Sequence, residues 1–207
     1  MTESSGSSEN LATDPDAPAD APLPRPFDAG LGSNYTSDSC PAFIRKFLAS
    51  SEFQKCLPLS LLLQNSNSFF KAEKSITRIT QVLDSICDAD FNSCSALMSS
   101  LAEGLRQEEN CAADYEAENS LVIQAYNGLV SFDSLFQAGC LRSSSGSYCF
   151  ADAITNFSSP SDSYIYFIPL GVPLPGASRP SCNECLKKSM SFFSNFASNA
   201  SEPVSTT

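Results

Sequence analysis

The chain has 207 residues and a formal net charge of −11, and its first 39 residues hold seven acidic side chains against a single arginine. An acidic chain without a basic stripe is repelled by nucleic acid and by anionic membrane surfaces, so we expect neither as a partner. The chain also contains no histidine. This absence excludes Ser-His-Asp and Cys-His catalysis and histidine-ligated zinc or haem sites, so we expect a protein that is not an enzyme and holds no metal or cofactor.

Residues 1–39 are predicted to form a disordered acidic tail. They contain five of the 13 prolines, no cysteine and few large apolar side chains. Such a segment buries too little apolar surface to offset the entropy lost on ordering. The packed domain is expected to span residues 40–207, which is enough chain for one hydrophobic core. No run of eighteen apolar residues occurs, so we expect no membrane span in this chain.

Helical periodicity starts at the first cysteine, Cys40, where Pro41 suits the first turn of a helix. Ser51 and Gln54 form a capping box that predicts a second, short helix. Asp90 is expected to cap a later helix of about four turns. The apolar faces of the first three helices are Phe43, Ile44, Phe47 and Leu48, then Phe53, Cys56 and Leu57, then Phe69, Ala72, Ile76, Ile79, Leu83 and Ile86.

The second half of the chain continues this pattern with less regularity. A fifth helix is expected to end at Gly139, and a short one to follow from Cys149 to Phe157. Residues 164–168 are predicted to be extended, and residues 169–180 to form a loop rich in proline and glycine. Ser181 and Glu184 form a second capping box for a last helix. The predicted fold class is therefore all-α, a disulfide-linked bundle of about six to seven short helices with one irregular loop.

Nine cysteines are spread along the predicted helices rather than clustered in pairs, which indicates disulfides rather than a metal site. An oxidising compartment, outside the cell or at its surface, is the expected location. About 945 connectivities are possible, one cysteine is left over, and the sequence does not choose among them. The candidates are Cys40, Cys56, Cys87, Cys94, Cys111, Cys140, Cys149, Cys182 and Cys185.

Three Asn-x-Ser/Thr sequons, at Asn34, Asn156 and Asn199, are candidate N-glycosylation sites and agree with this location. Residues 1–25 contain no basic and apolar segment of the kind found in a leader peptide. We interpret this as a leader that the given chain lacks.

Three features could carry another function. Cys182 and Cys185 form a Cys-x-x-Cys pair that the predicted cap would place at a helix start, as in redox enzymes, although structural disulfides to other helices explain it better. The acidic side chains between Glu103 and Glu118 could serve carboxylate chemistry or bind calcium, but a solvated helix end is the simpler interpretation. The apolar helix faces could also enclose a cavity for apolar ligands instead of a solid core.

The order of these cysteines is similar to that of a known family. Ser39-Cys40-Pro41 before a Phe-rich helix, the six-residue spacing between Cys87 and Cys94, and Cys182-x-x-Cys185 before Phe192 resemble a family of fungal, predicted secreted or surface-anchored proteins that is defined only as a domain of unknown function. The resemblance covers residues 39–207. It implies a further cysteine beyond the last helix, so we expect the domain to be cut short at its C-terminus. It implies no catalytic residues.

The sequence therefore leads to one main hypothesis and two alternatives. The first is a non-catalytic extracellular or cell-surface glycoprotein domain, whose partners are cell-wall components or other surface proteins. The second is a secreted enzyme that uses carboxylates or the Cys182 and Cys185 pair. The third is a carrier of apolar ligands in a cavity between helices.

Overall fold

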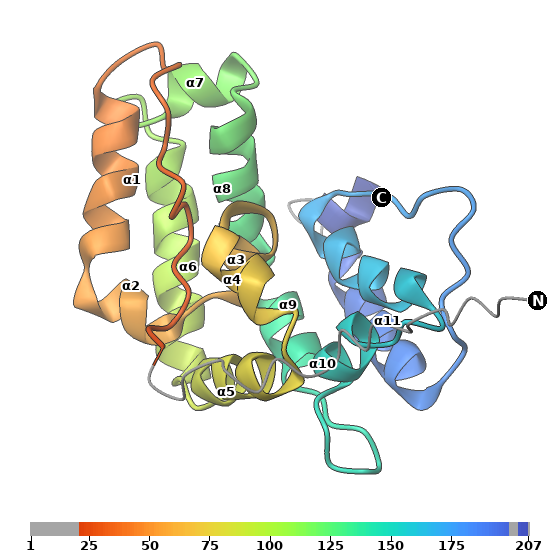
Figure 1. Ribbon diagram of the computed structural model, residues 1–207. Helices are drawn as coiled ribbons and strands as arrows, with labels where there is room; N and C mark the ends of the chain where they lie inside the picture. Colours follow the sequence, from red (N-terminus) through yellow and green to blue (C-terminus); the bar gives the residue numbers. More distant parts are fainter. Residues whose placement is uncertain (1–20, 199–202, 207) are drawn as a thin grey trace, which may run out of the picture.

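The computed structural model describes residues 21–198 and 203–206, and within these ranges the chain forms eleven α-helices and two 3₁₀-helices (Figure 1). The only pairing between extended residues there is a single bridge between Arg142 and Tyr148. The helices are α1 (Ser39–Ala49), α2 (Ser51–Cys56), α3 (Leu59–Asn65), α4 (Asn67–Ala72), α5 (Ile76–Cys87), α6 (Phe91–Leu105), α7 (Ala112–Glu116), α8 (Ser120–Val130), α9 (Phe132–Gly139), α10 (Cys149–Ile154), η1 (Pro160–Leu170), α11 (Glu184–Phe196) and η2 (Pro203–Thr206). The predicted all-α fold is confirmed.

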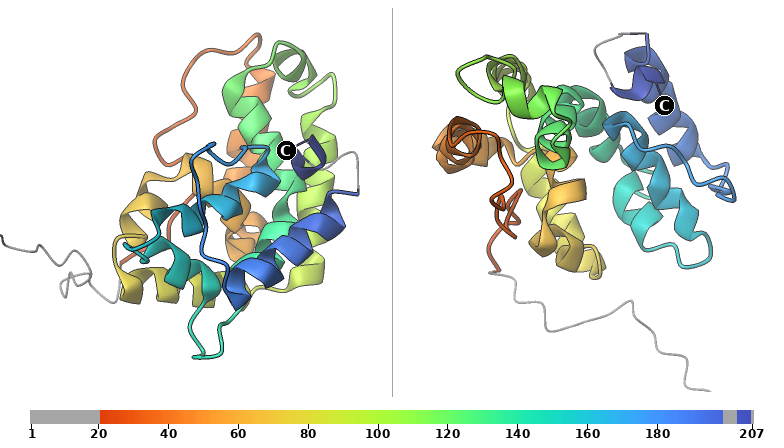
Figure 2. Two further views of the ribbon diagram at one scale, coloured as in Figure 1. Left: turned by 90° about the vertical axis from the view of Figure 1, so that its right-hand side faces the viewer. Right: turned by 90° about the horizontal axis from the view of Figure 1, so that it is seen from above.

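Two hydrophobic cores lie side by side. The first core is formed mainly by α1, α2, α6 and α8, and the second by α4, α5, α9, α10, η1 and α11. Helix α3 joins them, because Leu61 is buried in the first core while Leu59 and Leu62 are buried in the second. Figure 1 shows the first set of helices on the left and α10 and α11 on the right, with α3 and α9 between them, and the view from above in Figure 2 agrees.

Glycines allow α3 to pack closely against α8 and α9. A Cβ atom on Gly128 would overlap the side chain of Leu61, and a Cβ atom on Gly139 would overlap that of Leu59. Leu59 and Leu61 are both at most 1% exposed. The two cores therefore share a tightly packed seam, in which even one added methyl group would force neighbouring atoms to move.

The chain has more and shorter helices than the six to seven expected. The apolar repeat from Phe69 to Ile86 is split, because Ser75 accepts a hydrogen bond from the Arg78 N–H and so starts a new helix at Ile76. The predicted fifth helix, which ends at Gly139, is interrupted at Ser131, whose hydroxyl donates to the carbonyl of Pro169. Asp90 caps α6 as predicted, accepting a hydrogen bond from the Ser93 N–H at 2.7 Å.

Three local predictions are wrong. The cap of α2 is Ser50 rather than Ser51, and the cap of α11 is Asn183 rather than Ser181; each accepts a hydrogen bond from the N–H three residues later. Residues 164–168 are not extended but lie within the 3₁₀-helix η1. Ile165, Tyr166 and Ile168 are all buried there, and a run that is apolar on most sides fits a buried helical segment as well as a strand.

The packed domain also begins earlier than Cys40. Within residues 21–38, Phe27 and Leu31 are 6% and 9% exposed and belong to the first core. The Asp28 carboxylate accepts hydrogen bonds from the backbone N–H groups of Asn67 and Ser68, at 2.8 Å each, at the start of α4. The prediction of a tail as far as residue 39 is therefore wrong for residues 21–38, and residues 1–20 lie outside the described part of the chain.

Four disulfides link the helices. Two lie in the first core, Cys40–Cys111 and Cys56–Cys94, with sequence separations of 71 and 38 residues. Cys87–Cys140 joins the ends of α5 and α9, and Cys149–Cys185 joins α10 to α11. No helix in the described part of the chain has both the length and the apolar character needed to cross a bilayer.

Candidate ligand-binding groove

Exposed large apolar side chains gather in one place on this molecule. Single exposed side chains of this kind are normal, but a cluster of them marks an interaction site. Among the residues that the structure describes, four of the seven of this kind line one hollow, including Phe70 and Phe157, which are 61% and 63% exposed. The seven are Leu23, Phe70, Ile76, Phe157, Tyr164, Val172 and Leu174. The hollow is therefore the candidate site.

This hollow, which we call the apolar groove, lies between two parts of the second core. Helix α4 and the start of α5 form one wall, and α10, the turn after it and η1 form the other. Figure 1 and the left view of Figure 2 show these segments side by side. The groove has a volume of about 930 Å³. Its lining is Leu63, Phe70, Glu73, Lys74, Ile76, Phe150, Ile154, Thr155, Phe157, Ser163, Tyr164 and Phe167.

Neighbouring residues on α4 explain why the groove has an aromatic edge. Successive residues of an α-helix point about 100° apart, so Phe69 and Phe70 cannot both face the core. Phe69 is 1% exposed and packs on Phe150, at 6.1 Å between ring centroids, whereas Phe70 faces outward. The start of α4 is fixed by Ser66, whose hydroxyl accepts from the Phe69 N–H at 3.1 Å. The capped, disulfide-linked scaffold thus holds Phe70 at the surface.

The position of the opposite wall is fixed by hydrogen bonds to a buried carboxylate in η1. Asp162 accepts hydrogen bonds from the Ser159 hydroxyl at 2.7 Å and from the Ser181 N–H at 2.5 Å. Burial opposes ionisation, but these hydrogen bonds prevail and hold the pKa of Asp162 below its usual value. The ionised carboxylate closes the turn that carries Phe157, and this aromatic ring therefore stays at the edge of the groove.

Glu73 is the acidic member of the groove lining. It follows the last residue of α4, is partly buried, and receives no hydrogen bond or ion pair on its carboxylate from the residues that the structure describes. Burial raises the pKa of the Glu73 carboxyl to about 7. Lys74 next to it places its Nζ 4.8 Å from the centroid of the Phe70 ring, a cation–π contact. Near neutral pH, Glu73 can therefore be a neutral hydrogen-bond donor inside an apolar surface.

A second hollow adjoins the first and is more polar. It shares Leu63 and Phe70 with the apolar groove and has a volume of about 420 Å³. Asn65 lines it, and the Asn65 Nδ2 atom is buried without a hydrogen-bond partner in the structure. An unpaired buried donor is unfavourable by about 1–3 kcal/mol. This atom is buried too deeply for a ligand in the groove to reach unless the Asn65 side chain rearranges.

The cysteines predicted as disulfide candidates form four pairs, and Cys182 alone stays free and exposed. Cys185 pairs with Cys149 and not with Cys182, as expected for a structural disulfide to another helix. Cys182 precedes the cap residue Asn183, so it does not occupy the first position of the helix. The Cys-x-x-Cys pair is therefore not brought together as a redox site.

The acidic run between Glu103 and Glu118 is not gathered into a metal site. Asp114 is 1% exposed and accepts hydrogen bonds from the N–H and the hydroxyl of Thr36, at 2.8 and 2.9 Å. It thus anchors residues 21–38 to α7. Across residues 21–198 and 203–206, no three side chains of the types His, Cys, Asp and Glu are close enough to hold a metal ion.

The sequons differ in their surroundings. Asn34 is exposed and Asn156 is partly buried, whereas Asn199 lies outside the described residues.

The groove residues were missed by sequence reasoning, which assigned Ile76 to a buried helix face and did not separate Phe70 from Phe69. A weak signal was available, because Ser158, Ser159 and Pro160 directly follow Phe157 and end the short helix that the sequence predicts there.

Fold and groove together define an all-helical, disulfide-linked domain with an apolar surface site. The chain belongs to the family "Domain of unknown function (DUF7729)", whose sequence model matches residues 22–207. The match begins close to the first described residue, Ala21, in agreement with the early start of the packed domain. Comparisons with curated proteins and with solved structures gave no match.

Proposed function

We propose that this chain is an extracellular, non-catalytic glycoprotein domain that binds a neutral amphiphile in the apolar groove. Four disulfides support the location, because such bonds persist in oxidising compartments. The lack of histidine in the sequence supports a binding role rather than catalysis. The observation that carries the proposal is the clustering of four exposed large apolar side chains in one groove.

The lining of the groove indicates the chemistry of the ligand. Phenylalanine and aliphatic side chains outnumber hydrogen-bonding groups there, which suits a hydrocarbon chain better than a sugar. The whole chain carries a net charge of −11, which disfavours the approach of an anionic ligand, and the one cation in the lining, Lys74, already contacts the Phe70 ring. A hydroxyl or ester group on the ligand could accept a hydrogen bond from the neutral form of Glu73. These features favour a neutral, single-chain amphiphile.

The family resemblance adds a setting for this proposal. It implies a fungal cell surface, where cell-wall components and other surface proteins are further partners to test. The alternative of a redox enzyme receives no support from the groove, because Cys182 is exposed and Cys185 is already bonded to Cys149. The alternative of a carrier of apolar ligands is the one that the groove favours, with the site at the surface rather than enclosed between helices.

The test is a calorimetric titration with decanoylglycerol, a neutral amphiphile with one apolar chain. We expect the wild-type protein to bind it, and the double variant Phe70→Ser/Phe157→Ser to bind at least about tenfold more weakly, since each ring contributes roughly 1–2 kcal/mol of apolar contact. Because both rings are mostly exposed, the free energy of unfolding should change by no more than about 0.5 kcal/mol.

The matched control is Val172→Ser/Leu174→Ser, which removes two exposed apolar side chains outside the groove, 39% and 38% exposed. This control should bind as the wild type does. If decanoylglycerol gives no heat of binding with the wild type, or if both double variants bind it equally well, the groove is not the ligand site.

A further inference from the structure

We propose that the folded protein carries an N-linked glycan on Asn34 and none on Asn156. The inference rests on the proposed extracellular location, because only a chain that enters the secretory pathway meets the glycosylation machinery. Both residues stand in complete sequons, Asn34-Tyr35-Thr36 and Asn156-Phe157-Ser158. The two asparagines differ in their exposure and in the hydrogen bonds of their side chains, and this difference identifies which one carries the glycan.

Asn34 offers its amide to solvent. It lies in an exposed loop with Gly32 and Ser33, and a Cβ atom on Gly32 would meet no heavy atom within 4 Å. The backbone carbonyl of Asn34 accepts a hydrogen bond from the Asn119 side chain at 2.6 Å, whereas no hydrogen bond within residues 21–198 and 203–206 uses the Asn34 side chain. A glycan on this amide would project into open space and break no contact of the fold.

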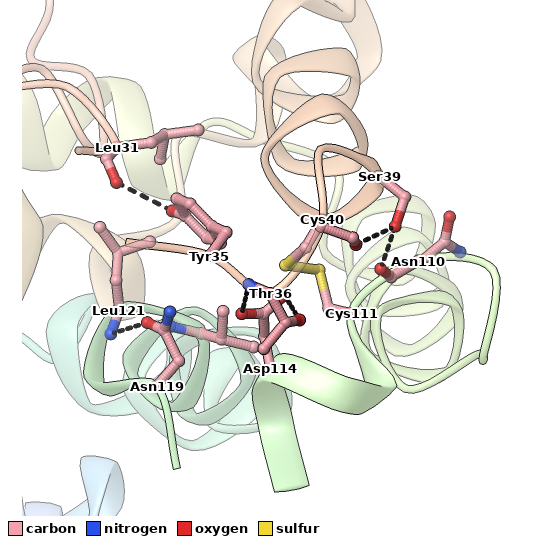
Figure 3. The surroundings of a disulfide bond; sticks show 12 residues. Leu31, Tyr35, Thr36, Ser39, Cys40, Asn110, Cys111, Asp114, Asn119 and Leu121 are labelled. Carbon is pink, nitrogen blue, oxygen red and sulfur yellow. Dashed lines mark hydrogen bonds between the residues drawn. A yellow bond between two sulfur atoms is a disulfide. The ribbon is translucent and has the colours of Figure 1, made fainter. Parts of the chain in front are cut away.

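Thr36, the third residue of this sequon, and Cys40 just after it are held by groups that come much later in the chain. Thr36 is held by Asp114, 78 residues further on, and Cys40 is bonded to Cys111, 71 residues further on (Figure 3). Until α7 has been synthesised and has docked, the Thr36 hydroxyl is free. The sequon is therefore accessible during a long part of synthesis, and its asparagine remains exposed after folding.

Asn156 is in the opposite situation. Its Nδ2 donates a hydrogen bond to the Asp162 carboxylate at 2.8 Å, and its Oδ1 accepts one from the Ser158 N–H at 3.2 Å. The main partner, Asp162, is only six residues away, so this contact can form as soon as the segment folds. The nitrogen atom that would carry the sugar is thus already used by the turn.

A glycan on Asn156 would disturb more than one hydrogen bond. Asp162 is 6% exposed and also holds Ser159 and the Ser181 backbone, which connects η1 to the segment before α11. If the sugar displaced Asn156, this buried carboxylate would lose a donor that stabilises its charge. Chains modified at Asn156 would be less stable, and the folded, secreted fraction should lack this glycan.

The experiment uses the full chain with an added leader peptide, secreted from a eukaryotic host, in an Asn199→Gln background that leaves these two sequons. Enzymatic removal of N-glycans in ¹⁸O-labelled water marks each formerly modified asparagine, and peptide mass spectrometry then reads the occupancy of both sites. Because the leader forces passage through the secretory pathway, a failure of this inference is distinct from a failure of the proposed native location or of the groove.

We expect the label on Asn34 and not on Asn156. Asn34→Gln should abolish the shift in gel mobility on deglycosylation, while Asn156→Gln should keep the shift and lower the melting temperature, since it displaces the amide from Asp162. A label on Asn156 in the folded, secreted protein would overturn the proposal, as would an unlabelled Asn34.

Discussion

The two cores of this domain differ in how completely the apolar side chains around them are covered. Around the first core, the apolar faces of α1, α2, α6 and α8 are covered, and residues 21–38 add Phe27 and Leu31 as a further layer. Around the second core, α4, α5 and η1 contribute exposed apolar residues at the apolar groove, and the loop after η1 exposes Val172 and Leu174. Both regions have disulfides and capped helices, so a less stable framework in the second region does not explain why its apolar side chains are exposed. Under our proposal, the first region stabilises the domain and the second carries its binding surface.

The largest expected effect tests whether the first region is a scaffold only. The double variant Cys40→Ala/Cys111→Ala opens the link with the longest sequence separation, 71 residues. In the chain-entropy description this should lower the free energy of unfolding by about 4 kcal/mol, as measured by urea denaturation. The remaining folded protein should bind decanoylglycerol with unchanged affinity. A loss below about 1 kcal/mol, or a folded variant with an empty groove at saturating ligand, would contradict the division into two regions.

A smaller effect concerns Glu73 in the second region. Its pKa of about 7 in the folded protein lies above the ordinary value of 4.5, because burial disfavours the charged form. The protonated carboxyl is thus favoured by folding, so its stabilisation is complete below pH 4.5 and is lost as the pH rises through 7. Glu73→Gln should flatten this dependence and should raise the free energy of unfolding by about 3 kcal/mol at pH 8, with little change at pH 4.

The matched control is Glu103→Gln, which changes an exposed glutamate on α6. Urea denaturation at several pH values should give this control the wild-type profile. If Glu73→Gln also keeps the wild-type profile between pH 4.5 and 8, the carboxyl is solvated and the groove is less apolar than we describe.

An apolar ligand over Glu73 would raise its pKa further, so the affinity for decanoylglycerol should fall as the pH rises from 6 to 8.

Much of the fold could be predicted from the sequence, because helix periodicity and caps are local. The repeat of apolar residues located α5 and α6, and Asp90 was identified as a cap from its position alone. The presence of disulfides was also predictable, but their pairing was not, since it depends on which helices pack together. The role of residues 21–38 was missed because two apolar residues, Phe27 and Leu31, are too few to stand out in a polar segment.

The groove could not be predicted for a different physical reason. Apolar side chains that face a core and those that face a ligand have the same composition and often the same spacing. Ile76 fitted the buried face of a predicted helix, yet the break at Ser75 places it at the start of α5, where it is 38% exposed. Only the packing of α5 against α10, together with Phe69 of α4 on Phe150, brings it beside Phe70, Phe157 and Tyr164.

Hydrogen exchange of the wild-type protein with and without decanoylglycerol tests the central claim most directly, because it compares both regions in one measurement. Our account predicts that the ligand increases protection of backbone amides in α4, the start of α5, α10 and η1, and leaves α1, α2 and α6 unchanged. Protection confined to the first region, or spread evenly over both, would contradict it.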